Sequence, residues 1–501
     1  MTNGPIQRIV IVGGGTAGWM TAAGLSRVLA GPGMAISLIE SPEIGTVGVG
    51  EATIPPILGF NRFVGLDERL LLRDTAATFK LGIEFDGWHR PNARYFHPFG
   101  EFGVEMDAVP FQHWRRSAQG GFPDLWTFSL ETRAAMAGRF AHRSGIAHPL
   151  LGQTAYAYHF DAAAYAAMLR MIAERRGVNR IEGRIERASI DPANGHIASV
   201  ELADGRSIGG DLFIDCSGFR SLLLGETLGV PFVDWNHLLP CDRAWAVQTR
   251  GSDGAPYTRS IARTAGWQWR IPLQHRTGNG HVFSSAHVDE QAALDTLLAN
   301  LPAEPSTDPR RLTFRAGHRA CFWQGNCVGI GLAGGFLEPL ESTSIHLIQL
   351  GILRLIGLFP DPTFAPSLID EYNREMAEKF ALIRDFLLLH YRASERTEPF
   401  WRDCRAAPAP DRLAHRIDLY RASGVIPVED ADLFKPSSWL AVMEGQGISA
   451  QAHHPLLRHR SDAEVAARLQ RLATDIGNAV SSMPAATDYV AAARAAADKV
   501  V

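Results

Sequence analysis

A glycine-rich turn between a short apolar strand and a helix constrains the fold of this 501-residue chain most. Residues 8–12 form a β-branched run that predicts a buried strand, and Gly13, Gly15 and Gly18 follow in the spacing G-x-G-x-x-G. These glycines permit a tight turn, close approach of the backbone to a pyrophosphate, and close packing of a helix on the strand. The helix predicted over residues 19–29 would direct its amino-terminal end toward the phosphates.

Glu40 completes this pattern, because it lies 22 positions after Gly18 and ends a second strand predicted over residues 35–39. A carboxylate at this place accepts hydrogen bonds from ribose hydroxyls and repels a 2′-phosphate. The alternative is a glycine turn at an ordinary strand–helix junction, which the carboxylate and the flanking elements disfavour. The motif predicts a dinucleotide site but does not distinguish NAD from FAD.

Two later segments combine a predicted buried strand with glycine. Residues 210–215 precede Ser217-Gly218, and residues 326–332 precede Gly334-Gly335. They lie where the large flavoprotein monooxygenases return to their cofactor, and this resemblance implies FAD. A second G-x-G-x-x-G for a nicotinamide is not visible, so we expect the flavin to be reduced by another protein.

The character of the chain changes near residue 365. Residues 367–391 predict one long helix, and residues 461–500 form an alanine-rich helical stretch. We therefore predict a FAD-binding and catalytic core over residues 1–365 and a helical carboxyl-terminal region over residues 366–501. The predicted fold class is α/β, with a FAD-binding Rossmann-like core of the flavoprotein monooxygenase type, mixed sheets, and a mainly helical region that covers the substrate.

Composition excludes several function classes. The chain is 46% hydrophobic and 20% charged, which is typical of a globular protein and not of a disordered one. A formal net charge of −4 disfavours nucleic acid or an anionic membrane as the main partner. The longest apolar stretch, residues 347–359, is too short to span a bilayer. The amino terminus lacks the features of a signal peptide, and the five cysteines form no CxxC motif, so we expect a cytoplasmic protein.

Metal ligands are not expected. His453, His454 and His459 are close in sequence, but no HExxH motif or cysteine partner accompanies them. We predict that these histidines are solvated and that the protein holds no metal.

Lysine is rare in this chain. It occurs at four positions, Lys80, Lys379, Lys435 and Lys499, whereas the other basic residues are arginine. Lys80 stands between Phe79 and Leu81, so its amine is expected to be poorly solvated, either as a paired structural ion or as a functional group. The alternative is a surface lysine that extends its amine to water, which the preference for arginine elsewhere disfavours.

Glu341 is a second functional candidate. It lies in a largely apolar run after the third glycine segment, and buried carboxylates are rare unless they are paired or functional. Glu338 is the competing candidate, with a helix start as its structural alternative.

Three further motifs resemble those of the flavin-dependent halogenases of the tryptophan halogenase family. They are Gly48-Val-Gly-Glu51-Ala-Thr-Ile-Pro55 with Thr78-Phe-Lys80-Leu-Gly-Ile83, then Gly266-Trp267-Gln-Trp269-Arg-Ile271-Pro272, and Leu337-Glu338-Pro-Leu-Glu341-Ser342-Thr343-Ser344-Ile345. The resemblance extends from about residue 8 to about residue 400.

This resemblance implies halogenation of an electron-rich aromatic substrate with reduced FAD (FADH2), O2 and bromide or chloride. The halide would bind at the backbone amides of Thr343 and Ser344 and become hypohalous acid, which would move to Lys80. Whether Lys80 holds it by a hydrogen bond or as a haloamine stays open. Electrophilic aromatic substitution would follow, with Glu341 orienting the electrophile or stabilising and deprotonating the ring cation.

The resemblance also implies binding residues. Those expected to bind the cofactor are Gly13, Gly15, Thr16, Ala17, Gly18, Glu40, Glu51, Ala52, Thr53, Gly335 and Ile345. Trp267 and Trp269 would face the same side of a strand and separate flavin from substrate. His97, Phe99 and Trp439 would contact the substrate. Ordinary packing is the alternative for each of these aromatic residues.

Two departures from the family pattern concern the ligands. Residues 402–445 contain one tyrosine, Tyr420, where enzymes that take free tryptophan carry a tyrosine-rich stretch for its carboxylate and amine. We therefore predict an indole-type substrate without the amino-acid group. Ser344 replaces a common glycine beside the expected halide site, which favours bromide at least as much as chloride.

Two alternative functions use the same cofactor. A FAD-dependent aromatic monooxygenase, which is a hydroxylase, would not need Lys80, Glu341 or the tryptophan pair. A flavin-binding protein without catalysis is the other, and the presence of Lys80 and Glu341 disfavours it. A halogenase implies a separate NAD(P)H-dependent flavin reductase, and a homodimer is the general expectation for its assembly.

Overall fold

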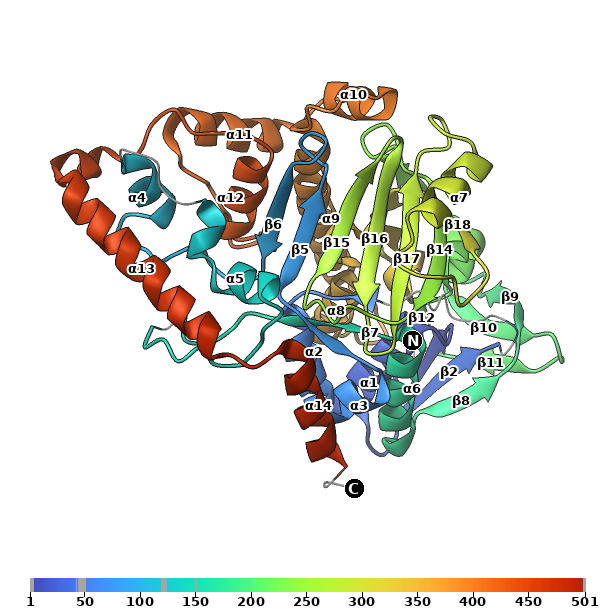
Figure 1. The fold of residues 1–501 in the computed structure, drawn as a ribbon. Coiled ribbons are helices and arrows are strands. Elements are labelled where there is room, and N and C mark those ends of the chain that lie inside the picture. Colours follow the sequence, from blue (N-terminus) through green and yellow to red (C-terminus); the bar gives the residue numbers. More distant parts are fainter. Residues whose placement is uncertain (1–3, 42, 44–50, 119–123, 149–150, 499–501) are drawn as a thin grey trace. The chain divides into compact units, whose positions relative to one another are not determined.

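The chain forms two compact units, each built from three separate segments. The computed structural model describes residues 4–41, 43, 51–118, 124–148 and 151–498 (Figure 1). Unit 1 comprises residues 1–75, 160–236 and 314–381, and unit 2 comprises residues 76–159, 237–313 and 382–501. These compact units follow other boundaries than the predicted division into residues 1–365 and 366–501. That functional division stays a prediction.

A six-stranded sheet forms the centre of unit 1. Its order is β20-β21-β12-β1-β2-β8, and all neighbours are parallel except β20 and β21. The strands are β1 (Arg8–Val12), β2 (Ala35–Glu40), β8 (Asn179–Glu182), β12 (Leu212–Asp215), β20 (Trp323–Gln324) and β21 (Cys327–Gly329). β1 and β12 are almost wholly buried, as expected for central parallel strands made mostly of apolar residues.

Two smaller sheets and a set of helices complete unit 1. The sheets are β9 (Ile185–Ile190), β10 (Ile197–Leu202) and β11 (Ser207–Gly209), and β13 (Phe232–Asp234), β19 (Gly317–Arg319) and β22 (Gly335–Phe336). The helices are α1 (Thr16–Leu29), α2 (Pro56–Val64), α3 (Glu68–Asp74), α6 (Ala162–Arg175) and α8 (Ser344–Gly357), and the segment β3 (Glu51–Ala52) also belongs to this unit. Helix α1 packs against α2, α6 and α8.

A seven-stranded sheet dominates unit 2 (Figure 1). Its order is β18-β14-β17-β16-β15-β5-β6, so strands from residues 82–98 join strands from residues 243–313. The strands are β5 (Gly82–Asp86), β6 (Arg94–Pro98), β14 (Arg243–Arg250), β15 (Thr258–Arg263), β16 (Gly266–Pro272), β17 (Arg276–Phe283) and β18 (Arg310–Thr313). A separate antiparallel pair joins β4 (Thr78–Lys80) to β7 (Ala157–Phe160).

Helices make up most of the carboxyl-terminal part. Those of unit 2 are α4 (Phe111–Ser117), α5 (Leu130–Met136), α7 (Glu290–Ala299), α10 (Pro399–Ala406), α11 (Asp411–Ser423), α12 (Pro436–Gly445), α13 (Asp462–Ser482) and α14 (Ala486–Ala497). Helix α9 (Pro366–Arg392) begins in unit 1 and ends in unit 2. It confirms the long helix predicted over residues 367–391. Across the part of the chain that the structure describes, no helix has both the length and the apolarity that a membrane crossing needs.

The predicted α/β class is confirmed, and most differences lie at the ends of elements. Helix α1 begins at Thr16 rather than Trp19, because the glycine turn itself provides the extended residue before the helix, Gly15. The alanine-rich stretch is helical as predicted, and it is divided into α13 and α14 because Pro484 follows α13 and lacks the backbone N–H that would continue it.

Candidate active site

The glycine turn of unit 1 is sterically fixed at two of its three motif glycines. Gly13 has a φ of 109°, and a Cβ there would lie 2.3 Å from the carbonyl oxygen of Cys216. A Cβ at Gly18 would lie 1.8 Å from the carbonyl oxygen of Gly13. Only glycine therefore allows α1 to pack this closely on β1.

Gly15 differs, because nothing in the described chain lies within 4 Å of the place its Cβ would occupy. It precedes the first turn of α1, where Thr16, Ala17 and Gly18 have backbone N–H groups without an acceptor four residues earlier in the helix. That turn holds no acidic side chain that would compete for an anion. Open space beside Gly15 and a free helix amino terminus fit the pyrophosphate of a dinucleotide.

Glu40 lies against the same turn. Its carboxylate accepts a hydrogen bond from Trp19 Nε1 at 3.2 Å and pairs with the guanidinium groups of Arg180 and, at 3.8 Å, Arg170. A Cβ at Gly14 would overlap the Glu40 side chain. Neither arginine was predicted as a site residue, because β8 and α6 approach Glu40 through pairings that span more than 120 residues.

The two later glycine segments meet this turn. Strands β12 and β21 lie parallel to β1, so their carboxyl ends share its edge. A Cβ at Gly331 would lie 2.9 Å from the Cβ of Ala17, which places the third segment on the first turn of α1. Their predicted convergence is confirmed. The edge matches the place where open α/β sheets bind ligands.

The start of α8 holds the predicted halide residues. Ser342 has a φ of 58°, and the residue after it, Thr343, is fully buried and precedes the first helical residue, Ser344. The helix begins its own hydrogen bonds when Leu347 N–H donates to the Thr343 carbonyl at 3.0 Å, so the preceding amides of the first turn lack a helical acceptor. Backbone donors and the helix dipole both suit an anion here.

Both carboxylate candidates lie just before this helix. Glu338 is 1% exposed and Glu341 is fully buried, so burial alone does not decide between them. Ile345 and Gly335, which were predicted as cofactor residues, are buried in the same unit.

Glu51 has an unusual titration. Burial raises the pKa of its carboxyl group to about 7. Its neighbours Ala52 and Thr53 are buried, whereas Gly48 to Gly50 of the predicted motif lie outside the described residues. A carboxyl group with this pKa exchanges its proton near neutral pH and has an O–H donor when it is protonated.

In unit 2, Lys80 is fully buried on strand β4. Its Nζ lies 5.1 Å from the centre of the Phe99 ring, and Phe99 N–H donates to the Leu81 carbonyl at 3.0 Å. The apolar context predicted for Lys80 is confirmed, and the alternative of a surface lysine is wrong. Two predicted residues, Lys80 and Phe99, are thus brought together, with the amine close enough for a cation–π interaction.

A buried histidine lies beside Lys80 on the same face of the β4–β7 pair. The strands place Thr78 opposite His159 and Lys80 opposite Ala157. Thr78 Oγ1 donates to the Pro272 carbonyl at 2.7 Å, so it accepts from His159 Nδ1 at 3.0 Å. His159 Nε2 then accepts from Thr258 Oγ1 at 2.9 Å. This ring is neutral, because burial and the nearby Lys80 hold its pKa well below the usual value.

The remaining predicted substrate residues belong to an aromatic cluster. His97 packs on Phe386 and Phe434, with ring centres 5.6 and 6.1 Å away. Trp439 meets Phe386 edge-on at 5.0 Å, and the Arg416 guanidinium lies 4.6 Å from the Trp439 ring centre. Phe386 and Phe434 were missed, because residues of α9 and the loop before α12 carry no local signal of a site.

Trp267 and Trp269 lie on β16, and both are buried. Their ring centres are 6.2 Å apart, and Trp267 is also 6.2 Å from Trp88. Trp269 covers Gly280 of the neighbouring strand β17, where a Cβ would lie 2.0 Å from the indole ring. Both rings therefore pack the core of unit 2, and their role beside a flavin stays a prediction.

A buried carboxyl group supports the segment that carries His97 and Phe99. Glu131 on α5 accepts a hydrogen bond from Ala155 N–H at 2.9 Å, and a Cβ at Gly100 would lie 2.0 Å from its Oε2. Burial raises the pKa of this group to about 7, and Glu101 contributes to the rise. No motif marks Glu131, so sequence reasoning missed it.

The single tyrosine of residues 402–445 is already bonded within the protein. Tyr420 is fully buried, and its hydroxyl donates to Glu444 Oε1 at 2.5 Å. Arg115 pairs with the other oxygen of Glu444 at 3.1 Å. Tyr420 is therefore not available to a substrate carboxylate.

The histidines near residue 454 are only partly solvated. His454 and His453 are half-buried, His459 is exposed, and the His454 ring meets His113 edge-on at 5.5 Å. His454 accepts from the Leu456 amide and so begins a short helical turn. Within the described ranges, no group of three or more His, Cys, Asp or Glu side chains is arranged to hold a metal ion.

Comparison with known proteins identifies the family. Residues 8–462 match the protein family described as tryptophan halogenase. Tryptophan 7-halogenase RebH from Lentzea aerocolonigenes is 36% identical, covering 92% of this chain and 93% of that protein. Among solved structures, Xcc4156, a flavin-dependent halogenase from Xanthomonas campestris, matches with 46% identity and a TM-score of 0.93, over 97% of this chain and 98% of that one. BrvH, a flavin-dependent halogenase from Brevundimonas sp. BAL3, matches with 43% identity and a TM-score of 0.93, over 97% and 99%. The chain therefore belongs to the tryptophan halogenase family.

Proposed function

We propose that this enzyme, a flavin-dependent halogenase, acts on an electron-rich aromatic compound without an amino-acid group, such as indole. The buried amine of Lys80, held 5.1 Å from the Phe99 ring, carries this proposal. An ordinary aromatic hydroxylase has no need of such an amine, so this alternative is not favoured.

The cofactor is FAD used in its reduced form, and the residues of unit 1 fit it. When bound, reduced FAD supplies with O2 the oxidising power that converts a halide ion to hypohalous acid. The open space at Gly15 and the first turn of α1 hold the pyrophosphate, and Glu40 accepts hydrogen bonds from the ribose. A separate flavin reductase supplies the reduced cofactor.

The halide is held at the start of α8. Backbone amides of Thr343 and Ser344 donate to the anion, and the positive end of the helix dipole adds to the attraction. Ser344 places a hydroxyl where glycine would leave space. Bromide is larger and less strongly hydrated than chloride, so we propose that bromide is used at least as well as chloride.

Lys80 receives the hypohalous acid and activates it. An N–H of the ammonium group donates to the oxygen of the acid, which withdraws electrons from the halogen and stabilises water as the leaving group. The aromatic carbon attacks the halogen, the oxygen–halogen bond breaks, and the Lys80 ammonium passes a proton to the departing hydroxide, so that water leaves and Lys80 is left as the neutral amine. Glu341 then accepts the ring proton, which restores aromaticity. His159 lies on the same strand face and is neutral, so it adds no second positive charge beside the Lys80 amine.

The substrate preference rests on the missing anchor for an amino acid. Phe99 offers a ring face for an indole, and His97 lies on the same segment. Tyr420, the one tyrosine of residues 402–445, donates to Glu444 instead. We also propose that the enzyme is a cytoplasmic homodimer, which rests on its cysteine pattern and on the frequency of such dimers.

Mass spectrometry tests the function directly. The reaction contains purified protein, FAD, a flavin reductase with NADH, oxygen, indole, and either bromide or chloride. We expect a product with the bromine or chlorine isotope doublet, and we expect a loss of at least about 100-fold in Lys80→Met, which keeps the aliphatic stem but not the amine. Lys435→Met is the matched control, because Lys435 is exposed before α12.

The outcomes separate the alternatives. Oxygenated indole without halogen would return the assignment to the hydroxylase, and full activity of Lys80→Met would exclude the proposed role of the amine. Faster turnover of free tryptophan than of indole would contradict the substrate preference alone.

A further inference from the structure

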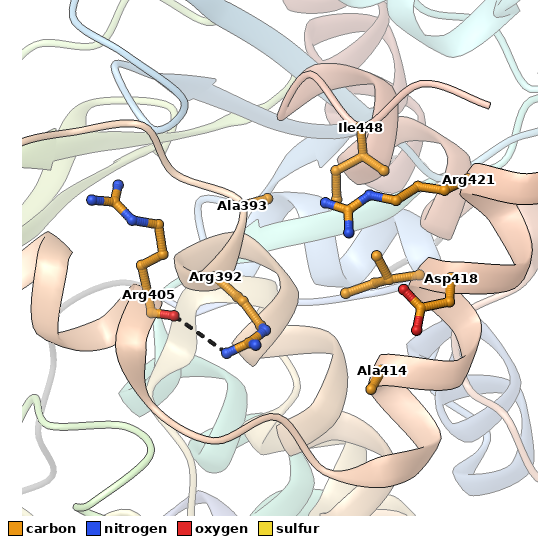
Figure 2. A pocket seen from close by; sticks show the side chains of 8 residues that line it. Arg392, Ala393, Arg405, Ala414, Asp418, Arg421 and Ile448 are labelled. Carbon is orange, nitrogen blue, oxygen red and sulfur yellow. Dashed lines mark hydrogen bonds between the residues drawn. The ribbon is translucent and has the colours of Figure 1, made fainter. Parts of the chain in front are cut away.

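A cavity with an unusual number of arginines lies in the carboxyl-terminal part of unit 2. It has a volume of about 300 Å³ and lies where the end of α9 meets α10, α11 and the residues after α12 (Figure 2). An adjoining cavity of about 390 Å³ shares part of its lining. Arg392, Arg405 and Arg421 line both. None of these residues belongs to the halogenation machinery proposed above.

Two of the guanidinium groups are oriented by backbone carbonyls. Arg392 Nη1 donates to the carbonyl oxygens of Arg405 at 3.2 Å and Ala407 at 2.5 Å. Arg405 Nη1 donates to those of Ser394 at 2.6 Å and Arg396 at 3.1 Å. A guanidinium group has five N–H donors, so each group is held in place and keeps donors for a ligand. In Figure 2 the Arg405 guanidinium points away from that of Arg392.

The charge of this cavity is not neutralised. Among the residues that the structure describes, no carboxylate oxygen lies within 4.0 Å of a guanidinium nitrogen of Arg392, Arg405 or Arg421. Other arginines of α11 are paired, since Arg412 meets Asp385 at 2.9 Å and Arg416 meets Asp432. Asp418 is the one acidic residue of this lining and Glu395 that of the adjoining cavity, so the three arginines leave the combined lining with a net positive charge.

The rest of the lining is apolar. It consists of the side chains of Ala393, Ala414, Ile417 and Ile448. Arginine binds carboxylates and phosphates through two parallel hydrogen bonds, and the volume is at the lower end of the usual range for ligand pockets, about 300–1,000 Å³. A ligand that matches both parts of the lining has an anionic head and a compact apolar body.

We propose that this cavity binds a small organic anion, in which a carboxylate or a phosphate is attached to an apolar body. Arg421 and Arg392 contact the oxyanion (Figure 2). Ile417 and Ile448 contact the body. Arg421 is the exposed member of the pair, and its side chain makes no hydrogen bond or ion pair with any described residue. Its substitution therefore removes the ligand contact with little effect on the fold.

Calorimetry with benzoate and phenyl phosphate at low salt tests this site. We expect at least one probe to bind wild-type protein, and Arg421→Gln to weaken binding by about tenfold or more, as the loss of a charged hydrogen bond predicts. Arg421→Lys should bind with intermediate affinity, because it keeps the charge but not the two-pronged geometry. Arg402→Gln is the matched control, since Arg402 is an exposed arginine of α10 outside the lining.

Each result has a defined meaning. Binding of benzoate alone, of phenyl phosphate alone, or of both supports the site and identifies its preferred oxyanion. The proposal is overturned if neither probe binds at millimolar concentration, if Arg421→Gln binds as tightly as wild type, or if neutral benzamide binds equally well. Indole halogenation by Arg421→Gln should equal that of wild type, so failure here is distinct from failure of the proposed function.

Discussion

At the glycine turn, an added methyl group should affect cofactor binding at Gly15 and folding stability at Gly18. Gly15→Ala places its Cβ in open space, so we expect a normally folded protein. The methyl group would nevertheless occupy the place where the pyrophosphate approaches the backbone, and FAD affinity should fall about tenfold. Flavin fluorescence titration measures the affinity, and thermal unfolding without FAD measures the stability.

Gly18→Ala is the contrasting variant. Its Cβ would overlap the Gly13 carbonyl, so the stability of unit 1 should fall by about 3 kcal/mol even without cofactor. If Gly15→Ala bound FAD as well as wild type, the turn would not hold the pyrophosphate. If Gly18→Ala were as stable as wild type, the close packing of α1 on β1 would not matter for the fold.

At the scale of one element, the buried carboxyl group of Glu131 links α5 to the segment that carries Phe99. Its pKa is about 7 in the folded protein, above the ordinary value of 4.5, so the folded state binds this proton more tightly. The stabilisation is complete below pH 4.5 and is lost as the pH rises to 7, by about 3 kcal/mol in total. Glu131→Gln keeps an uncharged side chain, so this loss should disappear.

Urea unfolding from pH 4.5 to 7.5 measures this effect. The difference in stability between Glu131→Gln and wild type should grow as the pH rises from 4.5 to 7 and then level off. Glu105→Gln is the control, because Glu105 is exposed in the same segment of unit 2. Parallel pH profiles of Glu131→Gln and wild type would show that the carboxyl group is not protonated in the folded state.

The elements themselves were largely predictable, whereas their long-range partners were not. Residues 8–12 and 367–391 predict a strand and a helix because hydrophobic periodicity is local, and β1 and α9 confirm both. Residues 405–436 are rich in proline and charge and carry no clear local helix signal, although α11 lies within them.

In the candidate site, too, local sequence signals were readable and long-range partners were not. Lys80 was found because a lysine between apolar neighbours is unusual in sequence. His159 and Glu131 were not found, because each acts through a partner set by tertiary pairing, Thr78 across β4–β7 and Gly100 across α5. Arg180 reaches Glu40 in the same way, through the β2–β8 pair.

At the scale of the whole molecule, the two units should respond differently to acid. In unit 2, burial lowers the pKa of His113 and His281 to about 4, and that of His159 falls well below its usual value. These rings take up protons only on unfolding, so the stability they contribute above pH 6.5 is lost as the pH falls. Glu131 acts in the opposite direction, because unfolding lowers its pKa from about 7 to 4.5 and releases about one proton. The three histidines and Glu131 together therefore give a net uptake of about two protons on unfolding between pH 6 and 5.

In unit 1, the proton uptake and the proton release on unfolding nearly cancel. Burial lowers the pKa of His346 to about 4 and raises that of Glu51 to about 7, so their proton terms cancel in the same range. The lowered pKa of His196 adds proton uptake on unfolding to unit 1, and the raised pKa of Glu84 reduces that of unit 2. Both shifts make the acid sensitivities of the two units more alike. Acidification should therefore destabilise unit 2 by about 2–3 kcal/mol per pH unit and unit 1 by less.

Hydrogen exchange at pH 7, 6 and 5, corrected for intrinsic rates, measures this contrast. Peptides from β14 and β17 of unit 2 should lose protection before those from β1 and β12 of unit 1, because exchange from core strands reports the opening of the unit around them. His281→Gln should reduce the acid sensitivity of unit 2 by about one proton, since glutamine still donates to the Ala293 carbonyl but does not titrate. Earlier loss of protection in unit 1, or an unchanged profile in His281→Gln, would mean that the buried histidines do not govern the acid response.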